Sequence, residues 1–121
     1  AGSVGDGVIE ACKEKKMMAV GVDRDQNYLA PQTVITSALK RVDNAIYNVA
    51  AELKKGTFKG GSTVYYGLAD GGVDVAPTTS KLVSASIMKE MEGIKARIKK
   101  GELKPPADAQ NYAKFEKTLK K

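Results

Sequence analysis

Two aspartates follow a short apolar run near the start of the chain. The run AVGV occupies residues 19–22, and Asp23 and Asp25 come next, with Gln26 directly behind them. Carboxylates at this spacing serve three kinds of chemistry: phosphoryl transfer, divalent-cation binding, and the binding of two vicinal sugar hydroxyls by one fixed carboxylate. A structural interpretation stands beside these three, in which Asp23 only ends a strand and caps a loop.

The first two of these chemistries fit the sequence poorly. Residues 19–25 resemble the haloacid-dehalogenase motif, an apolar strand followed by Asp-x-Asp-x-Thr, in which Asp23 would be the nucleophile and Asp25 the acid–base group. Position 27, however, is Asn and not Thr. A metal site would require Asp70 and Asp74, in the segment DGGVD, to meet the first two aspartates, and such a segment is more typical of a turn. We therefore expect no catalytic residue and no metal ligand, and phosphotransferase activity remains the alternative.

The first seven residues are rich in glycine. Gly2, Gly5 and Gly7 are spaced Gly-x-x-Gly-x-Gly, which differs from the Gly-x-Gly-x-x-Gly loop that binds dinucleotides. We expect a tight turn in which the backbone of Gly2 and Gly5 can approach a ligand, with Asp6 capping the helix that follows. The sequence predicts no cofactor.

The composition is that of one folded domain. The chain has 121 residues, of which 42% are apolar and 28% charged, and no apolar run reaches the roughly 20 residues of a membrane span. The net charge of +6 comes mostly from lysine. Nucleic-acid binding would favour arginine and aromatic residues on a basic face, so we expect no nucleic-acid partner. A basic balance also suits, weakly, a protein that works near an anionic membrane.

The chain contains no histidine and a single cysteine. Cys12 lies on an apolar helical face with Val8 and Ile9, which favours a buried structural thiol. Because no histidine is available to activate a nucleophile, the sequence favours binding over catalysis.

Helical and strand patterns alternate along the chain. Apolar runs predict strands in MMAVGV (17–22), TVITSAL (33–39) and STVYYGL (62–68), and the first suits a strand buried on both faces. Helical spacing predicts helices over 8–15 and 40–55, a long helix after Ser80 that closes at Lys99, Lys100 and Gly101, and a final helix over 108–121, with a loop over 70–80. This order predicts an α/β three-layer fold with a largely parallel sheet, whose ligands lie beyond the carboxyl ends of the strands.

Three motifs in a fixed order resemble a known family. GVDRDQ, TSALKRVD and YGLADGGV follow one another, and the segment IKKGELKPP closes the long helix. In this the chain resembles the basic membrane protein (BMP) family of ABC-transporter substrate-binding lipoproteins, similar to the purine nucleoside receptor, up to about Pro106. The resemblance implies the type I periplasmic-binding-protein fold.

The resemblance also implies an incomplete molecule. Family members are much longer and close two lobes around a ligand, so residues 1–121 correspond to the carboxyl-terminal portion, with residues 105–121 as a carboxyl-terminal extension or helix. By resemblance, Asp23 is the acceptor for ribose hydroxyls and Lys40 is a second polar contact. The purine-stacking side chains of the family would lie in the amino-terminal lobe.

The function that the resemblance implies is non-enzymatic. It is the extracytoplasmic capture of a nucleoside-like solute by a protein that carries a lipid anchor in its complete form, followed by delivery to an ABC permease. A surface adhesion or signalling protein on the same fold is a further alternative. The apolar surface that the missing lobe would cover can also let the fragment self-associate.

Overall fold

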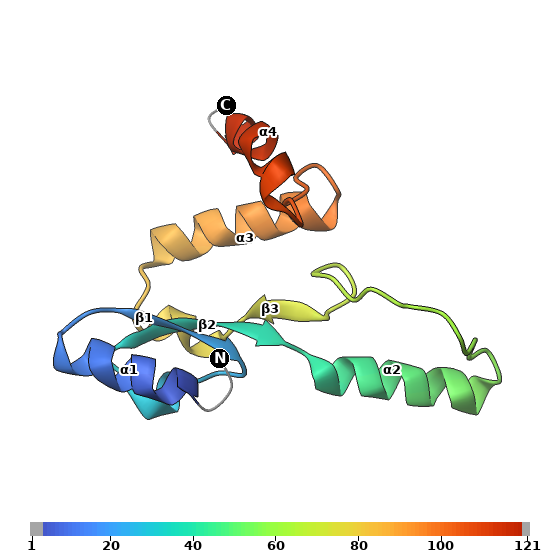
Figure 1. Ribbon diagram of the computed structural model, residues 1–121, viewed down its shortest axis with the longest axis horizontal. Helices are drawn as coiled ribbons and strands as arrows, with labels where there is room; N and C mark the ends of the chain where they lie inside the picture. The colour runs from blue at the N-terminus through green and yellow to red at the C-terminus, as the bar shows by residue number, and fades with distance from the viewer. Residues whose placement is uncertain (1–3, 120–121) are drawn as a thin grey trace.

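The computed structural model describes residues 4–119, and side chains up to residue 117. Along the chain, shown in Figure 1, the elements are α1 (Gly5–Glu14), β1 (Ala19–Asp23), the 3₁₀ turn η2 (Asn27–Leu29), β2 (Val34–Lys40), α2 (Val42–Lys55), β3 (Val73–Val75), the 3₁₀ turn η3 (Pro77–Lys81), α3 (Ala85–Lys99) and α4 (Ala109–Leu119).

The strands form one small sheet in the order β1-β2-β3. β1 and β2 run parallel, and their register places Asp23 beside Leu39. β3 pairs with the end of β2 in the antiparallel sense. The predicted α/β class and parallel pairing are therefore confirmed, and the third strand makes the sheet mixed.

The core lies where α1 packs on the sheet. Ile9 of α1 is buried together with Ala19, Ala30 and Val34. Cys12 packs against this cluster but is only half-buried, so the thiol is less buried than predicted. The helix begins earlier than predicted, since Gly5, Asp6 and Gly7 are already helical. The predicted glycine turn is therefore wrong at Gly5 and Gly7, and so is the predicted Asp6 cap: Val4 is the N-cap residue, and Asp6 lies in the first turn, where its charge suits the helix dipole.

The second face of β1 is open. Val20 and Val22 are exposed, so the predicted burial of this strand on both faces was wrong for the described residues. α2 extends beyond the end of the sheet (Figure 1) and buries none of its side chains, although Gly56 ends it as predicted, in the left-handed conformation. One side of the sheet and most of α2 therefore contact solvent.

The third strand does not lie where the sequence predicted it. Residues 62–68 are irregular, and the strand is Val73–Val75, inside the segment predicted to be a loop. A strand needs a neighbour for its backbone hydrogen bonds, and the open edge of β2 is paired with residues 73–75. The preceding segment is held by the Gly72 N–H, which donates to the Gly67 carbonyl over 2.9 Å.

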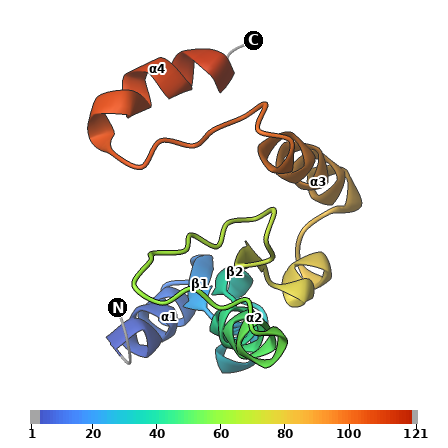
Figure 2. The ribbon, with the colours of Figure 1, turned by 90° about the vertical axis from the view of Figure 1, so that its right-hand side faces the viewer.

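The two last helices stand away from the sheet (Figure 2). α3 starts at Ala85, later than predicted, because residues 77–81 form the turn η3 and the Ser84 hydroxyl caps the helix. The final helix is present as α4 and follows Asp108, whose carboxylate accepts from the Asn111 N–H over 2.9 Å. No helix in the described part of the chain is long and apolar enough to cross a membrane.

Candidate functional site

The two side chains predicted to contact a ligand lie side by side. Asp23 is the last residue of β1 and Lys40 the last residue of β2, and because these neighbouring strands are parallel, both side chains lie at the same edge of the sheet. The Lys40 Nζ atom lies 2.9 Å from Asp23 Oδ1. The Lys40 and Asp23 side chains are 65% and 53% exposed, so a solute can reach both.

The ion pair favours the ionised form of the Asp23 carboxyl. The hydrogen bond from Lys40, and then its positive charge, lower the pKa of the Asp23 carboxyl below its ordinary value of 3.8. Lys40 in turn precedes α2, whose N-terminal dipole disfavours a cation. The nearby carboxylate therefore provides a local reason for a lysine at this position.

The backbone of Asp23 turns the carboxylate out of the strand. Its φ of 68° lies in the left-handed region, which aspartate tolerates better than most residues. The N–H of Arg24 donates to the Val22 carbonyl over 2.8 Å, which closes the turn. The carboxylate thus has a position set by the chain, and not only by Lys40.

Gln26 connects this turn to the next strand. Its buried side-chain Oε1 accepts from the Val22 N–H over 2.8 Å, and its own N–H donates to the Ser37 hydroxyl over 3.0 Å. Gly21 lies directly over these groups, and a Cβ atom there would fall 2.9 Å from Gln26 Oε1 and closer still to the Ser37 hydroxyl. Only glycine fits at position 21 without a shift of this network.

Asp25 is tied into the loop. Its carboxylate accepts from the Thr78 hydroxyl over 2.7 Å and from the Asn27 N–H over 3.1 Å. Partial burial opposes ionisation, but these two hydrogen bonds outweigh it and lower the pKa of Asp25 below its ordinary value. Asp25 therefore links the loop after β1 to the turn after β3, which is a structural role.

Two further contacts hold the same region. The buried Asn27 amide donates to the carbonyls of Pro31 and Val34 over 3.2 and 3.0 Å. The Thr36 and Thr79 hydroxyls lie 2.6 Å apart, which connects β2 to η3. The edge that bears Asp23 is consequently a connected hydrogen-bonded unit.

The structure says less about Gly2 and Gly5, the other two residues predicted to contact a ligand. Gly2 lies outside the described residues. Gly5 is the first residue of α1, which runs opposite to β1 and begins near the edge where β1 ends (Figure 1). The guanidinium of Arg41, the residue after Lys40, contacts Asp43 and Asn44.

Sequence reasoning missed Ser37, Thr78 and Thr79. The Asp25–Thr78 hydrogen bond joins residues 53 positions apart, and no local pattern marks that pairing. Ser37 could have been found, because a buried strand position occupied by a hydroxyl residue needs a hydrogen-bond partner.

The metal interpretation finds no support among the described residues. They contain no group of three or more side chains suited to hold an ion. Asp70 accepts from the Gly67 N–H, and Asp74 pairs with Lys95 of α3 over 2.8 Å. These carboxylates thus have separate structural partners.

The fold and the site together define a class. A small α/β unit with a parallel strand pair carries an exposed carboxylate–ammonium pair beyond the strand ends, where α/β proteins bind small ligands. This is the class of α/β ligand-binding proteins.

Comparison with known proteins identifies the family. The model of PnrA-like ABC transporter substrate-binding proteins matches residues 1–109, and the chain belongs to this family, which is one of binding proteins and not of enzymes. Basic membrane protein A of Borreliella burgdorferi is 38% identical over 118 residues, covering 95% of this chain and 34% of that protein. Basic membrane protein D of the same species is 38% identical over 119 residues, covering 95% and 35%.

Two solved structures share the fold of this chain, and one of them is a solute-binding protein. An ABC transporter solute-binding protein from Aeropyrum pernix K1 superposes with a TM-score of 0.71 at 27% identity, over 99% of this chain and 43% of that one. A transcriptional activator of the comK gene from Bacillus halodurans superposes with a TM-score of 0.75 at 25% identity, over 84% and 35%. The chain spans about a third of the length of the curated relatives it matches.

Proposed function

We propose that this chain supplies one wall of a solute-binding cleft in an ABC-transporter binding protein, and that the solute is a nucleoside, with purine nucleosides preferred. The protein would act outside the cytoplasm, held to the membrane by a lipid in its complete form, and would pass the solute to a permease. Family membership supports the solute-binding role. The Asp23–Lys40 pair is the observation that carries the nucleoside proposal.

The chemistry of the pair suits a ribose. An ionised carboxylate has two oxygens that accept from two vicinal hydroxyls, and it donates nothing. Lys40 lowers the pKa of Asp23 and so favours its ionised form, and an ammonium with three N–H groups can donate to the carboxylate and to a ribose or ring oxygen at once. No catalytic group is required for this recognition.

The solvent exposure of Asp23 and Lys40 suits a binding cleft whose opposite wall is formed by a second lobe. Both side chains are more than half exposed in this chain, so hydrogen bonds to a solute would compete with water. A second lobe that covers the solute would remove that competition, and binding would then favour the closed arrangement.

The test uses a longer family protein that carries this sequence together with the remaining length seen in its relatives. Purine nucleosides are expected to raise its melting temperature, and Asp23→Asn is expected to remove most of the shift. Asp43→Asn is the matched control, because Asp43 is also an exposed aspartate paired with a cation at 2.8 Å. If no nucleoside shifts the melting temperature of the unsubstituted protein, the solute assignment is wrong.

A further inference from the structure

The positive charge of the chain is concentrated at its carboxyl-terminal end. Residues 95–121 hold nine of the twenty Lys and Arg residues but only three of the fourteen Asp and Glu residues. Their net charge is therefore +6, which equals the charge of the whole chain, and residues 1–94 are neutral overall. We call residues 95–121 the basic segment.

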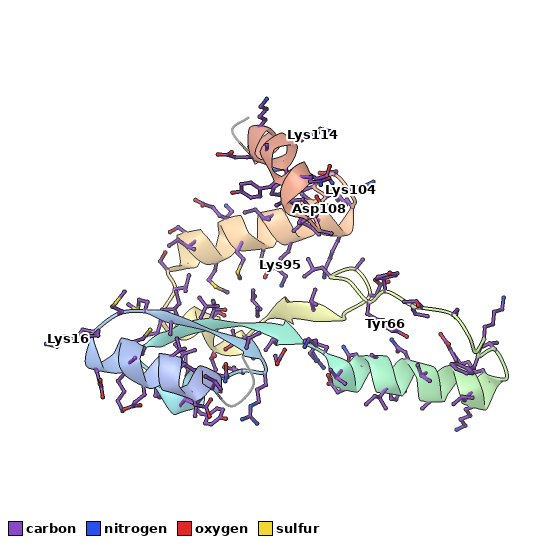
Figure 3. All side chains as sticks on the ribbon, viewed as in Figure 1. Lys16, Tyr66, Lys95, Lys104, Asp108 and Lys114 are labelled. Carbon is purple, nitrogen blue, oxygen red and sulfur yellow. The ribbon has the colours of Figure 1, made fainter. Side chains whose placement is uncertain are left out.

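The described part of the basic segment, residues 95–119, also occupies one pole of the molecule. α4 and the end of α3 lie on the side away from α1, as both views in Figures 1 and 2 show. Lys95 joins this pole to the sheet, because its ammonium lies 2.8 Å from Asp74 of β3 and 2.9 Å from Glu92 of α3 (Figure 3). Lys95 therefore lies near the end of β2, because Asp74 pairs with Leu39 there, whereas the lysines of α4 lie on a separate helix.

The other lysines of this pole are available to a partner. Five of them are exposed, and among the described residues none of the five forms an ion pair: Lys99, Lys100, Lys104, Lys114 and Lys117. Figure 3 shows Lys104 and Lys114 together around α4 and the end of α3. A cluster of unpaired lysines repels itself, so an anionic partner would relieve that repulsion.

The same pole carries apolar and aromatic groups among its cations. A hollow between the end of α3 and α4 is lined by cations, one carboxylate and apolar groups, of which Leu103 is buried: Arg97, Lys104 and Lys114, then Glu102, then Leu103, Pro106 and Phe115. The exposed Tyr112 lies on α4 as well. Long lysine stems and aromatic rings beside cations are typical of surfaces that rest in the headgroup region of a membrane.

We propose that the basic segment binds the surface of an anionic lipid membrane. Lysine, which is a compact point charge without planar fork geometry, supplies eight of its nine cations, and Arg97 supplies the ninth. This composition favours a diffuse anionic surface over the base and phosphate contacts of a nucleic acid. The family model matches residues 1–109 and so ends where α4 begins.

The test is co-sedimentation of the 121-residue chain with vesicles, in the absence of any solute. Its outcome is therefore separate from that of the nucleoside proposal. Vesicles of phosphatidylcholine mixed with phosphatidylglycerol should retain the protein at low salt, and pure phosphatidylcholine vesicles should not. Because screening shortens the range of exposed charges, raising the salt concentration should release the protein.

A matched pair of variants locates the binding surface. α3 ends in Lys99-Lys100-Gly101 and α2 ends in Lys54-Lys55-Gly56, so the same substitution can be made at two similar exposed sites. Each lysine near an anionic membrane contributes about fivefold to binding, so Lys99→Gln/Lys100→Gln should weaken partitioning on the order of tenfold or more. Lys54→Gln/Lys55→Gln, with the same net charge, should leave it nearly unchanged.

Several results would overturn the proposal. Retention by neutral vesicles, absence of retention by anionic ones, or an equal loss in both double variants would each contradict a basic segment that binds anionic lipid. Tighter binding to a single-stranded oligonucleotide than to anionic vesicles, lost in Lys99→Gln/Lys100→Gln, would assign the surface to nucleic acid instead. Circular dichroism of both variants verifies that the substitutions leave the fold intact.

Discussion

The Asp23 carboxylate is fixed from two sides. A left-handed backbone turns it out of β1, and Lys40 of the neighbouring strand pairs with it at 2.9 Å. Beneath the turn, Gln26 and Ser37 bind the backbone of β1 and of the loop. The position of the proposed binding group is therefore a property of the parallel strand pair.

The ion pair predicts a specific titration. Because Lys40 lowers the pKa of Asp23, the pair stabilises the fold above the unfolded pKa, and that contribution is lost as the pH falls through the lower folded pKa. Lys40→Gln should move the Asp23 midpoint up toward 3.8, measured by the ¹³C shift of its carboxyl in a pH titration. Lys54→Gln should leave it in place. An unchanged midpoint in Lys40→Gln would show that the pair does not persist in solution.

Two glycines that look alike in the sequence should respond in opposite directions to alanine. At Gly21 a Cβ would collide with the Ser37 hydroxyl and Gln26, so Gly21→Ala should lower the free energy of unfolding by about 1–3 kcal/mol. At Gly7, in α1, nothing lies within 4 Å of the added Cβ, and Gly7→Ala should raise it by about 0.5–1 kcal/mol. Urea denaturation of both variants measures this contrast, and a stabilised Gly21→Ala protein would contradict the packing described around the turn.

At the scale of elements, local patterns predicted what depends on local residues. The helices over 8–15 and 40–55 and the strands before Asp23 and Lys40 are present, because periodicity and capping residues act within a few positions. The third strand was misplaced, because the sequence of residues 62–68 favours a strand while the edge of β2 pairs with Val73–Val75 instead. The contact of Asp23 with Lys40 was not predicted, and it arises because β1 and β2 pair in parallel. The contact of Asp25 with Thr78 depends on where η3 packs.

The helices also differ in how much of each is packed against the core. α1 buries Ile9 in the core, whereas α2 buries no side chain, and its Ile46 is 66% exposed. Helical stability in proteins comes mostly from such packing. In the 121-residue chain, backbone amides of α2 should therefore exchange with deuterium much faster than those of β1 and β2. Mass spectrometry measures this exchange. Amides of α2 that exchange as slowly as those of the sheet would contradict an unpacked α2.

At the scale of the whole molecule, the exposed apolar face of α2 is considered together with the fraction of its relatives that the chain spans. The chain spans about a third of the curated relatives, and one face of α2 presents a contiguous apolar surface to solvent. Its residues are Ala45, Ile46, Val49, Ala50 and Leu53. Surfaces of this kind in a soluble protein are normally covered by protein.

The uncovered face predicts that the 121-residue chain self-associates. Sedimentation velocity should show a mean mass that rises with concentration, and Ile46→Gln/Leu53→Gln should reduce that rise. The control is Tyr65→Gln, because Tyr65 is an exposed side chain that does not belong to the apolar face. A strictly monomeric chain at high concentration would refute this expectation.

The central claim is that the carboxylate of Asp23 accepts the vicinal hydroxyls of a ribose. Calorimetric titration of a longer family protein that carries this sequence, with a purine ribonucleoside and its 2′,3′-dideoxy analogue, tests it directly. Hydrogen bonds to a charged group contribute about 1.5–3 kcal/mol, so Asp23→Asn should weaken ribonucleoside binding about ten- to a hundredfold. The same substitution should scarcely change binding of the dideoxy analogue. Equal losses for the two ligands, or no loss for either, would contradict the role assigned to Asp23.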